Sequence, residues 1–411
     1  MSGIRVNEWL HNSGTGGIWQ TSAGNVGIAS SVPTAKLVVT GDANVSGVAT
    51  AAAFIPSVGQ LGHRNLIING AMQVAQRGTI TSILASSVYG GPDRFKAYRV
   101  DSPGIWSASQ QESAPSGSGF GHCLEHKVTT ANGTLDAADI AAIQYLFEGQ
   151  DLTQVKKGTS SAEALTLSFW CRTATSGTYI AELYDSDNTR SCSKSFTHAG
   201  SDGWEKKEIT FPADTTGAFT HDTNESLQVN IILAAGSNFT SGSLATTWGS
   251  VTAANRAVGQ TNLSATLNNY FRITGVQLEL GSVATPFEHR TYGEELARCQ
   301  RYYYKKGDID DQSDDAPVAT FFYNSGTTWK GDVEYPVTMR TPPSLDVSNF
   351  TNAFRAYGNT NGHNSDTLGT SDMTRQTGRI TFVNASHPTS VLATGVRCNA
   401  SGAYLSFDAE L

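Results

Sequence analysis

Alternation of apolar and polar residues with a period of two constrains the fold of this chain more than any other feature. Every second position is apolar in 165–171 and in 227–233, and Val276, Leu278 and Leu280 alternate with polar residues. Residues at this spacing lie on one face of a β-strand, so these segments predict sheets with one buried face. Several such strands, separated by turns rich in Gly and Asn, predict a β-sandwich or barrel over residues 65–290. Segment 136–148 fits a helix or a strand.

Residues 1–64 differ from this pattern because they are small and polar, with apolar runs of only three to five residues. Such a segment buries too little apolar surface to offset the entropy lost on ordering. It is therefore either disordered or ordered by other copies of itself, and we expect the second. Three copies could interleave their short strands and bury the apolar positions Ile18, Val26, Ile28, Leu37, Val39 and Val45, which predicts a homotrimer.

One helix is predicted over 291–304. Thr291 followed by Glu294 fits a capping box, and Tyr292, Leu296, Cys299 and Tyr303 fall on one helical face. Residues 305–411 return to short alternating pieces and predict a second β domain. Within it, 357–375 is rich in Gly, Asn, Ser, Thr and Asp and predicts a long loop, a kind of segment that often has a function.

Charge and cysteine content exclude several classes of protein. The formal charge is −8 and Lys and Arg do not cluster, so we expect no nucleic-acid partner. No apolar run approaches the roughly 20 residues that span a bilayer, so we expect no membrane insertion. The five cysteines are widely spaced and odd in number. This argues against a disulfide scaffold and favours assembly in a reducing cytoplasm.

The sequence predicts neither a metal site nor a catalytic site. His122 and His126 would share one face of a strand, but a zinc ion needs at least one further ligand from elsewhere. The acidic run 308–315 fails the EF-hand pattern, because Ser313 and Ala319 stand where Gly and Glu are required. No phosphate-binding loop, nucleophile elbow or HExxH motif occurs. We therefore expect no cofactor and no enzymatic activity.

Aromatic and amide side chains give a better indication of function. Sugar rings stack their C–H faces on aromatic planes, while Asn, Asp and His can hydrogen-bond the hydroxyl groups. The predicted loop at 357–375 and a predicted hairpin before it combine both types. The candidate glycan-binding residues are Trp329, Tyr357, Asn359, Asn361, His363, Asn364 and Asp366. Trp106 and Trp248, beside turn-forming residues, are the next candidates.

Several segments resemble bacteriophage tail fibres. Residues 24–39 (GNVGI, then PTAKLVV) resemble fibre segments, and 65–78 (NLIINGAMQVAQRG) resembles the opening of a fibre domain. Residues 92–95 resemble a later part of the same domain, although Phe95 stands at a position often held by Trp. Residues 275–290 resemble its closing strand. Residues 296–304 resemble the helix that follows it.

The resemblance implies a mainly β protein with four parts. These are an intertwined N-terminal fibre segment (1–64), a jelly roll similar to carbohydrate-binding modules (65–290), a linking helix (291–304) and a C-terminal β-sandwich tip domain (305–411). It implies a homotrimer that is assembled in the host cytoplasm and forms part of the virion. The N-terminus would bind a baseplate or tail adaptor protein, and the tip would bind host-surface polysaccharide. The alternatives are a fibre-borne polysaccharide depolymerase and a structural spacer without a receptor.

Overall fold

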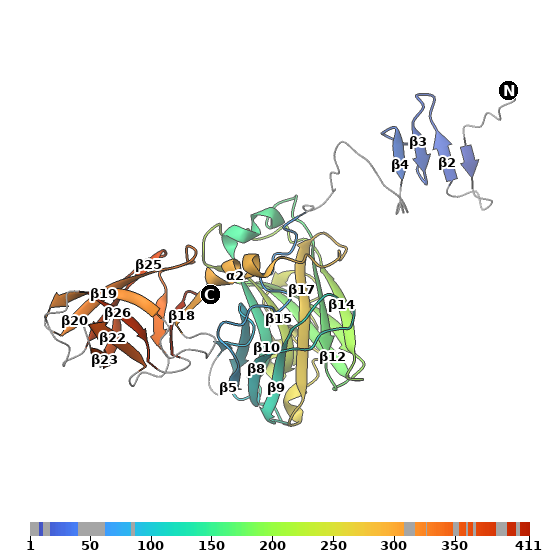
Figure 1. Cartoon of the computed structure of the whole chain (residues 1–411). Coiled ribbons are helices and arrows are strands. Elements are labelled where there is room, and N and C mark those ends of the chain that lie inside the picture. Colours follow the sequence, from blue (N-terminus) through green and yellow to red (C-terminus); the bar gives the residue numbers. More distant parts are fainter. Residues whose placement is uncertain are drawn as a thin grey trace. The chain divides into compact units, whose positions relative to one another are not determined.

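The computed structural model describes residues 8–10, 17–39, 62–83, 87–307, 317–325, 327–347, 353–358, 361–364, 367–383, 393–399 and 403–411. The chain divides into two compact units, Met1–Pro56 and Ser57–Leu411. The described residues of each unit form mainly β-strands (Figure 1). Helices of the described residues are short, and none is long and apolar enough to cross a membrane.

The first unit contains one small sheet among its described residues. Strands β1 (Glu8–Leu10), β2 (Gly17–Gln20), β3 (Val26–Ile28) and β4 (Leu37–Val39) follow in chain order, and β3 and β4 pair in parallel. The expected strand-length pieces are thus confirmed in 17–39. Position 45 lies outside the described residues.

Two antiparallel sheets form a β-sandwich in the second unit (Figure 1). In the described part of the chain, sheet I has the order β16 (Gly249–Ser250), β13 (Arg190–His198), β12 (Gly177–Asp185), β15 (Glu225–Ala235), β10 (Ile140–Glu148), β7 (Phe95–Val100) and β6 (Val88–Tyr89). Sheet II has the order β14 (Trp204–Phe211), β11 (Leu165–Arg172), β17 (Tyr270–Leu280), β9 (Cys123–Thr130), β8 (Ile105–Gln111) and β5 (Ile80–Ile83). The ambiguous segment 136–148 contains the interior strand β10, between β15 and β7.

The hydrophobic core lies between sheets I and II. It contains the alternating residues of 165–171, those of 227–233, and Val276 and Leu278, so the predicted buried faces are confirmed. Short helical turns connect the strands: η1 (Gly149–Val155), α1 (Ser237–Thr240), η2 (Ala253–Asn255) and η3 (Leu263–Ala265). All five cysteines are buried and free.

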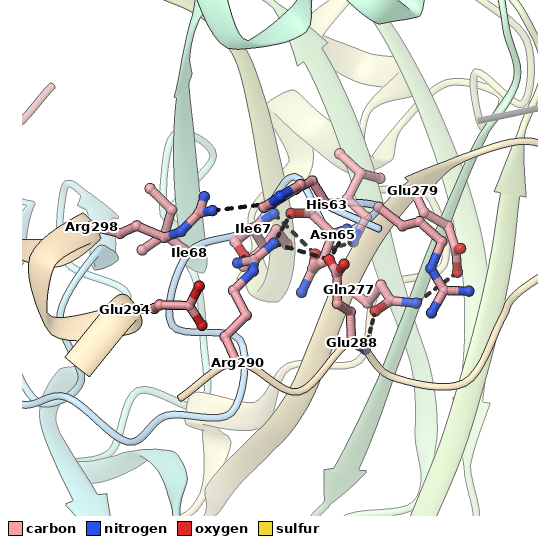
Figure 2. Close-up of polar contacts among 12 residues, drawn as sticks. His63, Asn65, Ile67, Ile68, Gln277, Glu279, Glu288, Arg290, Glu294 and Arg298 are labelled. Atoms are coloured by element: carbon pink, nitrogen blue, oxygen red, sulfur yellow. Dashed lines mark hydrogen bonds and ion pairs between the residues drawn. The ribbon is translucent and has the colours of Figure 1, made fainter. Parts of the chain in front are cut away.

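The two ends of the sandwich sequence meet at one structural junction, which Figure 2 shows. The Asn65 amide donates to the Val276 carbonyl (3.1 Å), and the Asn65 backbone N–H donates to Glu288 (2.9 Å). Arg290 donates to the Ile67 carbonyl (3.1 Å) and pairs with Glu295 on helix α2 (Tyr292–Gln300) at 3.0 Å. The segments that resemble fibre proteins, 65–78 and 275–290, therefore close the sandwich and attach the helix.

Helix α2 runs over Tyr292–Gln300 and has the predicted capping box. Thr291 Oγ1 accepts from the Glu294 N–H (3.3 Å), and Glu294 accepts from the Thr291 N–H (3.2 Å). The prediction that the helix continues to residue 304 is wrong. Tyr303–Gly307 forms β18, because β27 (Tyr404–Asp408) offers this segment an antiparallel partner.

The C-terminal part forms two further sheets of described strands. Sheet III has the order β18, β27 and β21 (Ser344–Val347). Sheet IV has the order β23 (Asn361–Asn364), β22 (Phe354–Gly358), β26 (Ala393–Cys398), β19 (Pro317–Ser325), β20 (Thr328–Glu334), β25 (Thr377–Val383) and β24 (Thr367–Met373). A second hydrophobic core lies here.

Polar contacts join this C-terminal part to the sandwich. The buried Arg94 pairs with Glu410 and lies over the Tyr302 ring at 3.4 Å. Arg301 pairs with Glu148 of β10 (2.6 Å). The two hydrophobic cores are separate, but these ion pairs connect the sandwich to the C-terminal part.

Candidate functional site

The structure separates Trp329 from the other predicted glycan-binding residues that it describes. Trp329 lies on β20 with 0% of its surface exposed, packed edge-on against Tyr323 (ring centroids 5.8 Å apart) and Phe382 (6.5 Å). A side chain in that position stabilises the C-terminal core and offers no face to a sugar. In sheet IV, β26 and β19 separate β20 from the strand that carries Tyr357.

The predicted long loop at 357–375 is also wrong, because most of it forms strands. Tyr357 lies on β22, and Asn361, His363 and Asn364 lie on β23 at the edge of sheet IV, where His363 pairs with Ala356. Backbone hydrogen bonds between paired strands stabilise this polar segment in the extended conformation. Asn359 and Asp366 lie outside the described residues.

Trp106 and Trp248 are likewise not exposed platforms. Trp106 is buried in the sandwich core, and its indole N–H donates to the Pro103 carbonyl (3.2 Å). Trp248 is half-buried and donates to the Pro212 carbonyl (2.8 Å). Both rings are held by the packing and hydrogen bonding expected of structural tryptophans.

A different set of residues forms a polar cluster on the outer face of sheet I. Adjacent strands β7, β10, β15 and β12 place Lys96, Gln144, Asn230 and Glu182 in one cross-strand row. Their neighbours along each strand point to the opposite side and form the sandwich core. The row therefore faces away from the core.

Hydrogen bonds fix the side chains of this row. The Gln144 amide donates to Gln228 Oε1 and Asn230 Oδ1, both at 3.0 Å, and the Asn230 amide donates to Glu182 Oε2 at 3.0 Å. Gln228 in turn donates to Glu225 (2.6 Å). Gln144 and Asn230 are only 4% and 3% exposed, so the amides form a fixed, buried network beneath the partly exposed residues around it.

The Arg256 side chain lies at one end of the row, where its positive charge faces Glu182. Its guanidinium forms a bidentate pair with the fully buried Glu182, with both N···O distances at 2.7 Å. Burial acts to lower the pKa of Arg256, but the hydrogen bonds and charge of Glu182 outweigh it and raise the pKa overall. Arg256 therefore keeps its positive charge at this position.

Two tyrosines border the cluster and remain partly accessible. Tyr184 lies beside Arg256, whose guanidinium carbon is 5.1 Å from the ring centroid, and Tyr98 occupies the adjacent row on β7. Both are half-buried, and burial raises the pKa of Tyr98. The segment 236–260 covers the rest of this outer face through Phe239, Leu244 and Ala257. We name Lys96, Tyr98, Gln144, Glu182, Tyr184, Gln228, Asn230 and Arg256 the outer-face cluster.

Sequence reasoning missed the outer-face cluster, although a signal exists. Gln144 interrupts an otherwise apolar strand, and Gln228 and Asn230 alternate with the core residues of 227–233. Polar residues at these alternate positions show which strands have a polar outer face. The order β7-β10-β15-β12, which makes them neighbours, comes only from the tertiary structure.

Of the two histidines considered as metal ligands, His126 lies on β9 and His122 directly precedes that strand. His126 on β9 is buried, and desolvation lowers its pKa to about 4. Among the described residues, no group of three or more His, Cys, Asp and Glu side chains has a geometry suited to a metal ion.

Comparison with known proteins gives low similarities. No family model and no curated protein matches the chain. Among solved structures, tailspike protein 4 of bacteriophage CBA120 matches over 53% of this chain and 21% of its own, with 10% identity and a TM-score of 0.29.

TmCBM61, solved with β-1,4-galactotriose, matches 53% of this chain and 99% of its own, with 12% identity and a TM-score of 0.27. A family 11 carbohydrate-binding module from Clostridium thermocellum matches 52% and 99%, with 12% identity and a TM-score of 0.25. The assignment of a β-sandwich rests on the two sheets of this chain and not on these matches.

Proposed function

We propose that this chain is a non-enzymatic, glycan-binding subunit of a bacteriophage tail fibre. The observation that carries the glycan-binding part is the outer-face cluster, in which five partly exposed residues surround the buried network of Gln144, Glu182 and Asn230; the five are Lys96, Tyr98, Tyr184, Gln228 and Arg256. Sugar hydroxyls are donors and acceptors at once, and the partly exposed Lys96, Gln228 and Arg256 offer polar groups to bind them. The tyrosine rings supply faces on which sugar rings stack.

The extent of the cluster favours an oligosaccharide as ligand. Four adjacent strands contribute side chains, and neighbouring strands lie about 4.8 Å apart, so the row spans roughly 14 Å. A surface of this length contacts several consecutive sugars. Because the donors and acceptors are fixed before binding, ordering them costs little on association.

Binding of purified full-length protein to host-surface polysaccharides tests the proposal. We expect the substitutions Tyr184→Ala and Tyr98→Ala each to weaken binding about tenfold or more, because each removes a stacking face. Phe322→Ala is the matched control, since Phe322 is an exposed aromatic residue of β19 outside the cluster. Equal binding by the parent and both tyrosine variants, with unchanged melting temperatures, would contradict the outer-face assignment.

The two alternatives predict different results in the same assay. A depolymerase would release oligosaccharides from the polysaccharide during incubation, whereas a non-enzymatic glycan-binding protein leaves the polysaccharide intact. A structural spacer would neither adhere to susceptible cells nor block infection. The tail-fibre part of the proposal, with a virion location and a baseplate or tail adaptor as N-terminal partner, is supported by the order of the fibre-like segments along the chain.

Self-association through the first unit is supported by an exposed apolar sheet face. Cross-strand pairing puts Ile18, Ile28 and Val39 in one row and Val26 and Leu37 in the next row on the same face. Ile18, Ile28 and Leu37 are 45%, 41% and 60% exposed in the single chain. Further copies of the chain would cover this face, as in the predicted homotrimer.

Light scattering on the full-length protein tests this assembly. We expect a trimer for the parent and a smaller species for Ile28→Lys, which puts a charge on the apolar face. Thr34→Lys places the same charge at an exposed position between β3 and β4 and should leave the trimer intact. A well-folded parent monomer at micromolar concentration would contradict the proposal.

A further inference from the structure

A pocket of about 520 Å³ lies where helix α2 and strand β18 meet the start of the sandwich. Residues of 73–76, Gln110 of β8, the exposed side of α2 and β18 line it. This volume is within the range of small-molecule sites, roughly 300–1,000 Å³. The pocket shares no lining residue with the outer-face cluster.

The charged residues among the described lining of the pocket are both lysines. Lys305 and Lys306 line it, and no Asp or Glu does so in the part of the chain that the structure describes, whereas the whole chain carries a formal charge of −8. Lys305 lies over the Tyr404 ring at 4.0 Å. The half-buried Lys306 ammonium has no hydrogen bond or ion pair with any residue that the structure describes. Desolvation lowers the pKa of Lys306, against the opposing charge of Glu334.

The remaining polar groups of the pocket are neutral and suited to hydroxyl groups. Gln110 donates its amide to the Met72 carbonyl (2.6 Å), which leaves its Oε1 as an acceptor. The Gln73 and Gln300 side chains form no hydrogen bond with the described part of the chain, so their amides can both donate and accept.

Apolar surface completes the lining. Tyr292 and Leu296 project from successive turns of α2, and Tyr292 is 57% exposed. Its ring is more exposed than either tyrosine of the outer-face cluster, both of which are half-buried. The pocket therefore combines an aromatic face, amides that can bind hydroxyls and one unpaired cation.

We propose that this pocket binds a single sugar that carries a carboxylate, such as a hexuronic acid, separately from the outer-face cluster. The carboxylate pairs with Lys306, the hydroxyls bond the amides of Gln73 and Gln300, and the ring packs against Tyr292. A charge-assisted hydrogen bond to a half-buried lysine is stronger than one between neutral groups, so the carboxylate provides the discrimination.

Isothermal titration of the full-length protein with methyl glucuronide, methyl glucoside and acetate tests this site. The first probe has the ring and the carboxylate, the second only the ring, and the third only the carboxylate. We expect methyl glucuronide to bind about tenfold or more tightly than either other probe. Equal binding of acetate and methyl glucuronide would show an anion site without sugar recognition and would overturn the proposal, as would undetectable binding of methyl glucuronide at millimolar concentration.

Three variants locate the binding. Lys306→Met removes the cation and Gln73→Trp fills the pocket, and both should abolish methyl glucuronide binding. Lys330→Met is the matched control, because Lys330 is a half-buried lysine of β20 in the same C-terminal part but outside this pocket. Unchanged affinity in both pocket variants would overturn the assignment.

Two further measurements distinguish a failure of the pocket proposal from a failure of the proposed glycan-binding function. The outer-face variant Tyr184→Ala should retain methyl glucuronide binding, whereas Lys306→Met should retain binding of longer neutral glycans. If Lys306→Met unfolds, Gln73→Trp decides the test. A loss of methyl glucuronide binding in Tyr184→Ala with retention in Gln73→Trp would place the acidic sugar on sheet I and overturn the pocket proposal.

Discussion

Lys157, directly after η1, holds a buried positive charge among four oxygen atoms. Its ammonium donates to Asp185, to the carbonyls of Thr216 (3.0 Å) and Gly217 (2.6 Å), and lies 3.1 Å from Asp214. The side chains of Lys157 and Asp185 are 2% and 0% exposed. Replacing Lys157 by Met keeps the length of the side chain but leaves the carboxylates and carbonyls without their shared donor.

We expect Lys157→Met to lower the free energy of unfolding by about 3–5 kcal/mol, the usual cost of removing one partner from a buried ion pair. The loss should not exceed this range, because Arg190 still pairs with Asp214 (2.8 Å) and the Asn188 N–H still donates to Asp185 (3.0 Å). It should be smaller at pH 5 than at pH 7, since a proton can then neutralise the stranded carboxylate.

Urea unfolding at both pH values checks this expectation. The double variant Lys157→Met/Asp185→Asn should recover part of the lost free energy, because it removes the uncompensated charge. Lys156→Met is the control: Lys156 is 52% exposed and pairs with Glu163 on the surface, so its loss should cost less than about 1 kcal/mol. A Lys157→Met protein within about 1 kcal/mol of the parent at both pH values would refute the reasoning.

Four further changes probe other parts of the structure. The pKa of His126 in the folded state is about 4, below its ordinary 6.5, so stability should fall as the pH drops from 6.5 to 4, by about 3 kcal/mol in total. His126→Leu should abolish this loss in unfolding titrations, whereas replacing the exposed His221 by Gln should not; equal slopes would contradict it. Trp329→Ala should destabilise the C-terminal core by about 3–5 kcal/mol and leave glycan binding by the sandwich unchanged, as followed by thermal unfolding and a binding assay. Thr291→Ala should lower the free energy of unfolding by about 1 kcal/mol because the capping box is lost, whereas Thr291→Ser should keep most of the parent stability. Glu410→Gln leaves the buried Arg94 without its ion pair and should lower the melting temperature, more so than Glu208→Gln at an exposed position within β14; equal melting temperatures would exclude a stabilising role.

Local sequence patterns predicted the strands of the sandwich because a strand with one buried face must alternate. The faces of 165–171 and 227–233 followed from this rule, and the capping box at Thr291 followed from the hydrogen bonds that a helix start requires. The end of the same helix did not, because β27, about 100 residues later in the chain, pairs with 303–307. The segment at 357–375 was predicted as a loop because Gly, Asn and Asp are rare in strands, yet β22–β23 and β24–β25 form hairpins and β22 also pairs with the distant β26.

The sequence by itself determined that this is a mainly β protein with one capped helix, and that the polar face of each strand lies opposite its buried face. Only the tertiary structure decided which strands are neighbours. Gln144, Glu182 and Asn230 come from separate segments, and their meeting in one row follows from the strand order of sheet I. The residues next to Trp329 in the sequence do not indicate whether its ring is buried or exposed. Its place in the core is decided by the packing of Tyr323 and Phe382 against the ring. The physical reason is that alternation fixes the direction of a side chain relative to its own strand, whereas strand order and burial depend on contacts between distant parts of the chain.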